Sequence, residues 1–214
     1  MRYSLILLPT ILSVFTSKVY GTPTPEATGG SDTETEVDVP TWNIEDASDG
    51  SIVQVNGTVE QLYAELADNH PELLATAFDL NALGTLPDDD NDDGYEEEDA
   101  ASLSKRTDFG GSSYYCYAGN LRASRSRLKE GIKYLNAVSG KPTMGAGGCH
   151  RVSCSYNAGI RWCNQDFVRK TLNSFGSIAD GAQFVLNTCP SGSKVGGLAT
   201  HKSKWRVEAH KMDC

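Results

Sequence analysis

A dibasic pair, Lys105-Arg106, divides this chain into two halves of opposite character. All six cysteines and 15 of the 19 lysines and arginines follow the pair, whereas 22 of the 28 acidic residues precede it. Residues 22–106 hold those 22 acidic side chains against two basic ones, a net charge of −20. Residues 107–214 hold 15 basic side chains against six acidic ones, a net charge of +9. A chance dibasic pair in a linker is the alternative, but charge, composition and cysteine content all change at this point. The sequence therefore predicts an acidic propeptide over 22–106, cut by a processing protease after Lys105-Arg106.

The N-terminus has the parts of a secretory signal peptide. Arg2 supplies a positive charge, and residues 5–15 form an apolar run that is too short to span a bilayer. Val19 and Gly21 stand three and one residues before a cut after Gly21. We therefore expect residues 1–21 to be a signal peptide and the protein to be secreted and extracellular, with no transmembrane segment elsewhere. In an oxidising compartment, six cysteines in the second half predict three disulfides.

Most of the propeptide has the composition of a disordered segment. Residues 22–57 are rich in Thr, Glu, Asp, Gly and Pro, which predicts disorder. Asn56 begins an Asn-Gly-Thr sequon for N-glycosylation. The acidic run 88–99 repels itself and should stay extended. It is either a spacer that exposes the protease site or an electrostatic mask that covers a basic surface until cleavage.

Two short stretches of the propeptide have helical apolar spacing. They cover 59–66 and 73–80, and Pro71 lies between them. Because proline cannot continue a helix through that position, we expect a break at His70-Pro71.

Residues 107–214 alternate strand and helix patterns. Residues 113–118 read as a first strand, and Asn120 as the N-cap of a first helix. Strands are predicted over 151–156 and 160–164, around a turn at Asn157-Ala158-Gly159. The first helix has apolar positions at Leu121, Leu128, Ile132, Leu135 and Val138, with basic residues between them at Arg122, Arg125, Arg127, Lys129 and Lys133.

The sequence from Ser177 to the C-terminus predicts a second helix and a final strand. Ser177 and Asp180 resemble a capping box, and the helix that follows ends before Pro190. Apolar residues alternate with polar ones over 205–210, which predicts one buried face and one solvated face. The fold class is α+β, an antiparallel sheet with two main helices packed on it, preceded by a largely disordered acidic propeptide. The 108 residues from 107 to 214 can bury only a modest hydrophobic core, and disulfides would supplement it.

The cysteines admit two interpretations. Six cysteines allow 15 disulfide pairings, and spacing alone does not choose among them. A structural zinc site is the alternative, but no Cys-x-x-Cys pair occurs and the spacing from Cys149 to Cys154 and Cys163 suits zinc poorly. We therefore expect disulfides and no metal. A bridge to Cys214, the final residue, would hold the last strand against fraying.

Three segments of this half resemble known secreted proteins. They are the stretch Arg-Val-Ser-Cys-Ser-Tyr-Asn-Ala-Gly-Ile over 151–160 followed by Trp162-Cys163-Asn164, the stretch 174–182, and the terminal stretch 205–214. Together they resemble the fungal glycan-binding (Y-three-like, lectin-like) domain family. They resemble more distantly the virally encoded killer toxin of smut fungi, a disulfide-bonded α/β sandwich. The resemblance covers about 107–214 and none of the propeptide.

The resemblance implies a set of disulfides and a mode of action. The implied pairs are Cys116–Cys189, Cys149–Cys163 and Cys154–Cys214, although the toxin carries more cysteines than this chain. It also implies antiparallel strands with two helices on one side. Both families act by binding outside the cell, one to glycans and the other on calcium-channel function at a target cell, and neither is known as an enzyme.

Glycan binding needs flat aromatic faces beside planar polar side chains. Alternation along the first strand places Tyr115 and Tyr117 on the face opposite Tyr114 and Cys116. If the cysteine face is buried, the pair Tyr115 and Tyr117 is exposed and forms the candidate glycan site. A tyrosine in a strand can also be a core residue with its hydroxyl at the edge. Trp162 and Trp205 lie in strongly patterned strands and are expected in the core.

Catalysis is a second candidate. Arg206, Glu208 and His210 share one face of the last strand, and these are the groups that a secreted ribonuclease uses for acid–base chemistry on a phosphodiester. The alternative is a solvated strand face with an ordinary salt bridge. His150 and His201 lie in loop-like sequence without a visible partner. No motif of a known hydrolase or phosphate-cradling loop occurs, so we expect no catalytic residues and no cofactor.

Charge alone gives a third candidate. A net charge of +9 can draw the domain to anionic walls, headgroups or nucleic acid by salt-sensitive attraction, although it can equally serve solubility. The sequence as a whole predicts a secreted binding protein for extracellular glycans or another cell-surface target, acting as a lectin-like protein, toxin or effector. A killer-toxin-like channel or membrane inhibitor is the alternative, and a ribonuclease is a weaker one. We expect no specific nucleic-acid partner.

Overall fold

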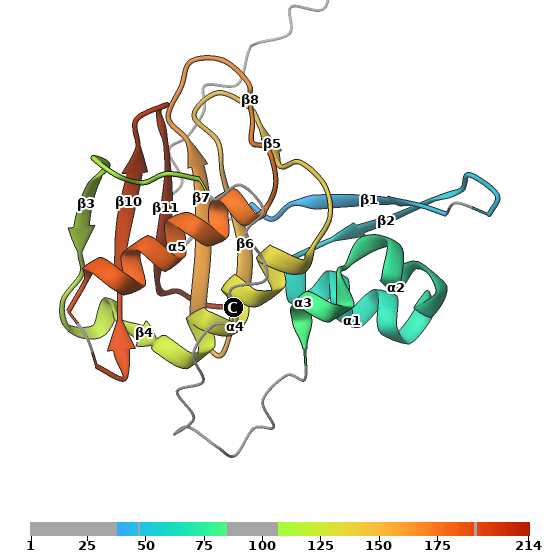
Figure 1. Ribbon diagram of the computed structural model, residues 1–214, viewed down its shortest axis with the longest axis horizontal. Coiled ribbons are helices and arrows are strands. Elements are labelled where there is room, and N and C mark those ends of the chain that lie inside the picture. Colours follow the sequence, from blue (N-terminus) through green and yellow to red (C-terminus); the bar gives the residue numbers. More distant parts are fainter. Residues whose placement is uncertain (1–37, 47, 85–106, 191) are drawn as a thin grey trace, which may run out of the picture. The chain divides into compact units, whose positions relative to one another are not determined.

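A five-stranded antiparallel sheet is the frame of residues 107–214 (Figure 1). Its strands lie in the order β3 (Ser113–Cys116), β10 (Gly197–His201), β11 (Trp205–Lys211), β7 (Ala158–Asn164) and β6 (Cys149–Ser155). Each neighbouring pair is antiparallel. The computed structural model describes residues 38–46, 48–84, 107–190 and 192–214. The predicted signal peptide, the acidic run 88–99 and the processing site Lys105-Arg106 lie outside the described residues.

Two helices, α4 (Arg125–Ala137) and α5 (Gly176–Thr188), cover one face of this sheet (Figure 1). Glycines in both helices allow the helices to lie close to the sheet. A Cβ atom on Gly131 of α4 would come within 2.2 Å of the Ser153 hydroxyl, and one on Gly181 of α5 within 2.6 Å of Val207. The predicted α+β class, with an antiparallel sheet and helices packed on it, is confirmed. Trp162 and Trp205 are buried on the helix side, together with Val207 and Ala209.

Three local predictions are wrong in detail. The first helix begins at Arg125 rather than after Asn120, because Ala123–Ser124 (β4) pairs with Lys194–Val195 (β9) and keeps the chain extended; Gly119–Leu121 is a short 3₁₀ turn (η1). Leu121 is consequently exposed.

The second helix has no capping box, since α5 begins after Phe175 and the Asp180 carboxylate instead accepts a hydrogen bond from the Thr107 amide at 2.6 Å. The turn between β6 and β7 is formed by Tyr156 and Asn157, with φ of 48° and 60°. Two consecutive positive φ angles are the geometry that a two-residue hairpin favours.

The six cysteines form three disulfides, which pair Cys116 with Cys189, Cys149 with Cys163, and Cys154 with Cys214. This is the pairing that the resemblance implied. The first bridge ties β3 to the end of α5, the second joins directly opposed residues of β6 and β7, and the third fastens the C-terminus to β6. Because all six cysteines are in disulfides, none is left as a thiolate that could bind zinc. Two short strands, β5 (Thr143–Met144) and β8 (Lys170–Thr171), form a separate antiparallel pair.

The described part of the predicted propeptide is folded. It contains β1 (Thr41–Glu45), β2 (Ile52–Asn56), α1 (Val59–Asn69), α2 (Pro71–Ala77) and α3 (Leu80–Leu83). The prediction of disorder is therefore wrong for 41–45 and 52–56, where the polar composition masked the alternation of Trp42 and Ile44 with polar neighbours. The predicted break at His70-Pro71 is present, and Pro71 is the first residue of α2. Asn56, the predicted glycosylation site, is exposed at the end of β2.

Residues 38–84 pack against residues 107–214 and share their core. The Trp42 ring lies 4.7 Å from the Phe175 ring, centroid to centroid. The Glu60 carboxylate accepts the Ser153 hydroxyl at 2.5 Å and the Cys154 amide at 3.1 Å. Backbone bonds also cross the boundary, from the Asp79 amide to the Ala137 carbonyl and from the Ser139 amide to the Ala77 carbonyl, each at 2.8 Å. Residues 38–84 contain no cysteine, so these contacts are all non-covalent.

Cutting the chain between residues 84 and 107 should therefore leave the two parts associated. We would replace residues 100–106 by the recognition sequence of a specific protease, cleave the folded protein and compare native with denaturing size exclusion. One native peak containing both fragments is expected, because the shared core would otherwise be exposed to water. Glu60→Gln should weaken the association about tenfold, since a carboxylate that accepts two part-buried hydrogen bonds is lost.

Asp68→Asn is the matched control, because Asp68 lies exposed on the same helix. It should leave the association unchanged. Separation of the wild-type fragments on cleavage at micromolar concentration would contradict the prediction.

Candidate functional site

One face of the sheet is free of the helices α4 and α5, and we call it the open face. Strand register places one row of side chains across it, in the order Tyr115, Leu198, Glu208, Arg161 and Arg151. Arg206 and His210 flank Glu208 on β11, and Tyr117 follows β3 on the same side. The predicted catalytic trio and the predicted tyrosine pair therefore belong to a single surface.

Glu208 is the centre of this surface and is almost completely buried, with 3 % of its side chain exposed. Its Oε2 accepts hydrogen bonds from Nε of Arg161 at 2.9 Å and from Nη2 of the same guanidinium. Its Oε1 lies 2.7 Å from Nε of Arg206, an ion pair without hydrogen-bond alignment. The prediction of a solvated face on β11 is thus wrong at Glu208, because two arginines cover the carboxylate.

The pKa of Glu208 is lowered to about 2. Burial alone would raise this pKa, but the neighbouring His210 ring, the hydrogen bonds from Arg161 and the charges of Arg161 and Arg206 outweigh the burial. Glu208 therefore stays ionised, and it orients two guanidinium groups. Arg161 and Arg206 are 41 % and 34 % exposed, so solvent and ligands reach the arginines but not the carboxylate.

The aromatic side of the surface begins at His210. Its Nδ1 lies 2.7 Å from the Lys211 carbonyl oxygen and its Nε2 lies 3.7 Å from Oε2 of Glu208. The Tyr117 ring stands edge-on to His210 at 5.0 Å, and Tyr115 stands edge-on to Tyr117 at 5.7 Å. Tyr115 is 64 % exposed, whereas Tyr117 is half-buried. Burial first, and then the charge of Glu208, raise the pKa of the Tyr117 phenol, so this phenol is neutral at physiological pH.

Three arginines from the predicted first-helix pattern have partners within the fold. Arg122 donates to the Lys194 carbonyl, and Arg125 donates to the carbonyls of Gly192 and Leu186. Arg127 pairs with Glu130 at 3.0 Å and lies over the Tyr156 ring. Their guanidinium groups thus stabilise contacts between and within elements of the fold.

The two other histidines considered as acid–base candidates, His150 and His201, lie apart from the open face. His150 lies 3.2 Å from the Asp38 carboxylate and lines a cavity of about 330 Å³ between β1 and residues 139–143. Trp162 also lines this cavity, and its indole N–H has no hydrogen-bond partner among the described residues. His201 contacts the Ser203 hydroxyl and the Trp205 ring. Burial lowers the pKa of His201.

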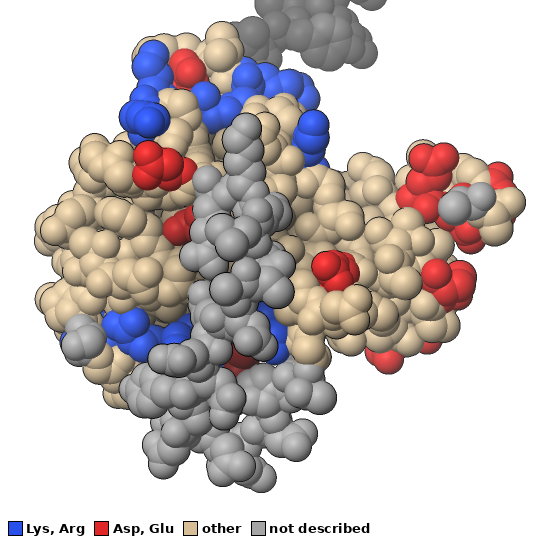
Figure 2. Space-filling model, viewed as in Figure 1, with Lys and Arg blue, Asp and Glu red and all other residues tan. Residues whose placement is uncertain are grey.

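Two surface features were not predicted from the sequence: the position of Arg161 and an exposed apolar loop. Arg161 stands between Ile160 and Trp162, which are buried on the helix side, so alternation in the predicted strand could have placed it on the open face. The second feature is a loop with the apolar pair Phe167 and Val168, both strongly exposed. Figure 2 shows that Lys and Arg side chains gather at the end of the domain where the loops of Figure 1 connect β7 to β8 and β10 to β11.

Comparison of the chain with protein-family models, with curated proteins and with solved structures gives no match. The function is therefore argued from the surface itself. Among the described residues no helix has the length and apolar composition that a bilayer crossing requires. The same residues contain no group of three or more histidine, cysteine or acidic side chains placed to hold a metal ion.

Glu208→Gln should lower stability by about 2–3 kcal/mol at pH 7, because two guanidiniums lose the carboxylate that pairs them. In the wild type the folded pKa of about 2 lies below the ordinary value of 4.5. The stabilisation is therefore complete above about pH 4.5 and is lost as the pH falls towards 2. The variant should lack this acid-dependent component. Chemical denaturation between pH 2 and pH 7 measures both effects.

Glu130→Gln provides the control, since Glu130 forms an ion pair with Arg127 within one helix. A change below about 1 kcal/mol is expected there. Equal losses of unfolding free energy in the two variants would show that the Glu208 ion pairs stabilise the fold no more than an ordinary surface ion pair does.

Proposed function

We propose that this protein is a secreted binding protein that recognises acidic glycans through the open face. The observation that carries the proposal is the row from Tyr115 to Arg161 with its neighbours Tyr117 and Arg206. In it an exposed and a half-buried tyrosine lie on the same face as two arginines held by a buried carboxylate. Three disulfides in 107–214 support an extracellular setting. The resemblance to lectin-like fungal domains agrees with this proposal.

The chemistry of the surface suits a sugar that carries an anionic group. Tyr115 offers a flat apolar ring for the C–H groups of a sugar, and the phenols of Tyr115 and Tyr117 can bond its hydroxyls. The guanidinium edges of Arg161 and Arg206 that Glu208 does not use can pair with a carboxylate, sulfate or phosphate. The arginines are already oriented before the ligand arrives, which lowers the entropic cost of binding.

A glycan array probed with the secreted protein at low and at moderate salt tests the proposal. Selective binding to acidic glycans should persist at moderate salt. It should fall at least tenfold in Tyr115→Ala/Tyr117→Ala, because a stacked aromatic anchor is lost. Arg161→Gln should remove the preference for acidic over neutral glycans.

Tyr156→Ala is the matched control, because Tyr156 is 71 % exposed and lies in the turn between β6 and β7. It should bind as the wild type does. Absence of selective binding, or binding to every polyanion that moderate salt abolishes, would remove the carbohydrate proposal.

Ribonuclease action is the second candidate, and the contact between Glu208 and His210 favours it. The arrangement brings a carboxylate, a histidine and two arginines together, which is the set that phosphodiester cleavage requires. Two observations place it second. The Glu208 carboxylate is buried, and its low pKa makes it a weak base near neutral pH, where an effective base has a pKa close to the working pH.

If the open face binds rather than cleaves, the protein should leave single-stranded RNA intact from pH 5 to pH 8. The measurement is gel analysis of a labelled oligoribonucleotide, with His210→Ala purified in parallel to reveal contaminating nuclease. Cleavage by the wild type that is abolished in His210→Ala would reverse the ranking of the two candidates.

A further inference from the structure

Two loops at one end of the sheet form a surface that the open face does not include. Residues 165–169 connect β7 to β8, and residues 202–204 connect β10 to β11. The Gln165 amide donates to the Lys204 carbonyl at 3.0 Å, so the two loops are joined. We call them the tip loops.

The first tip loop exposes two neighbouring apolar side chains. Phe167 is 92 % exposed and Val168 is 62 % exposed. Scattered single apolar residues are normal on a protein surface. An aromatic ring exposed almost completely, next to an exposed branched aliphatic residue, leaves apolar area in water that burial in a partner would remove.

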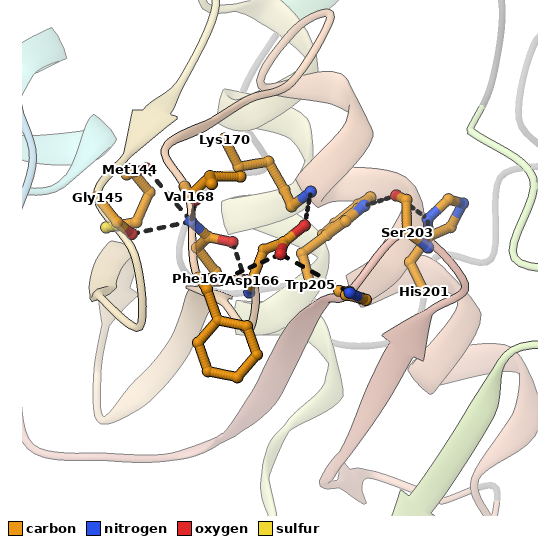
Figure 3. Close-up of polar contacts among 11 residues, drawn as sticks. Met144, Gly145, Asp166, Phe167, Val168, Lys170, His201, Ser203 and Trp205 are labelled. Carbon is orange, nitrogen blue, oxygen red and sulfur yellow. Dashed lines mark hydrogen bonds and ion pairs between the residues drawn. The ribbon is translucent and has the colours of Figure 1, made fainter.

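Polar contacts beneath the loop fix this presentation (Figure 3). The buried Asn164 side chain donates to the carbonyls of Gly145 at 2.9 Å and Val168 at 2.8 Å, and its oxygen accepts the Asp166 amide at 3.0 Å. The Asp166 carboxylate in turn accepts the Phe167 amide at 2.9 Å. The backbone on both sides of Phe167 is therefore held in place, and the ring, which is 92 % exposed, loses little packing when it enters a partner.

Cations surround the apolar pair. Lys170 and Lys204 place their ammonium groups 3.4 Å and 3.8 Å from the Asp166 carboxylate, while Arg169 and Lys202 are exposed. The Phe167 amide first, and then the two lysines, lower the pKa of Asp166, so it is the one anion in this group. With Lys170 at the start of β8 included, four cations against one anion give the tip loops and this residue a net charge of +3.

We propose that the tip loops are a docking surface for the outer face of a bilayer that contains anionic phospholipid. Phe167 and Val168 enter the boundary between headgroups and acyl chains, and the surrounding lysines and arginines contact lipid phosphates. Apolar insertion flanked by basic residues is the physical basis of interfacial membrane binding.

Size and charge favour a lipid surface over a protein receptor. A stable protein interface buries roughly 800 Å² on each partner, with about 20–30 residues a side. Here two apolar side chains stand among cations on joined loops, which is too small a core for such an interface but sufficient for a shallow, reversible contact with lipid. The surface uses residues other than those of the open face, so its failure and the failure of glycan binding are separable.

Vesicle binding with an inserted reporter tests the proposal. The three native tryptophans, Trp42, Trp162 and Trp205, are buried, so a tryptophan at an exposed site reports separately. We would prepare Phe167→Trp and, as the matched control, Tyr156→Trp. Each would be mixed with vesicles of phosphatidylcholine alone or with about a third phosphatidylserine. A blue shift and protection from an aqueous quencher are expected for Phe167→Trp only, and only with the anionic vesicles.

Cosedimentation of unlabelled variants completes the test. Phe167→Ser/Val168→Ser should reduce binding to anionic vesicles about tenfold or more, because the inserted apolar area is lost. Lys202→Gln/Lys204→Gln should reduce it by a similar factor and flatten its salt dependence. Leu121→Ser, which removes an exposed apolar residue elsewhere, should bind as the wild type does.

Three outcomes would overturn the proposal. They are no binding of the wild type to anionic vesicles, binding that Phe167→Ser/Val168→Ser leaves intact, and equal blue shifts at positions 167 and 156. The second outcome would show plain electrostatic adsorption of a basic protein. The first would leave a protein receptor as the occupant of the tip loops.

Discussion

The ion pair between Glu208 and two arginines determines what the open face can do. A buried carboxylate is tolerated only when it is paired, and here the partners come from two adjacent strands, Arg161 from β7 and Arg206 from β11 itself. Because both sides of the pair are held by strand register, the guanidiniums have little freedom to reorient. The carboxylate carries no direct contact with a ligand. Its effect is to hold two otherwise flexible cations in fixed, partly exposed positions.

The same reasoning ranks binding above catalysis. An acid–base catalyst needs a group that exchanges protons near the working pH, whereas the arginines keep Glu208 ionised down to about pH 2. His210 points one ring nitrogen at a backbone carbonyl and the other towards Glu208. An arrangement that stabilises one protonation state so strongly suits electrostatic recognition of an anion, where constancy of charge is an advantage.

Much of the fold followed from patterns that survive without tertiary information. The alternation over 205–210 predicted the last strand and its buried residues, and helical spacing predicted the burial of Leu128, Ile132 and Leu135. The predictions failed where contacts between residues distant in the sequence determine the local structure or the burial of a side chain. Ala123–Ser124 is extended because Lys194–Val195 lies beside it, and Glu208 is buried because Arg161 covers it from another strand. The hairpin of β1 and β2 was missed because its acidic, polar composition outweighed a short alternation around Trp42. Alternation could have placed Arg161 on the open face, but its pairing with Glu208 followed only once β7 was aligned with β11. No pattern in the sequence marked the exposure of Phe167, which lies in a loop.

Strand pairing also explains why two surfaces of different chemistry occur close together. Along β7 and β11, Arg161 opposes Glu208 at the open face, and three residues further Asn164 opposes Trp205 where the tip loops begin. Three residues of strand span about 10 Å, so the two surfaces are built on one rigid pair of strands. A protein that held an acidic glycan on the open face and lipid at the tip loops would gain from both contacts at once, since the second contact forms at high effective concentration. Weak binding at each surface would then be enough to select a cell surface that displays both ligands.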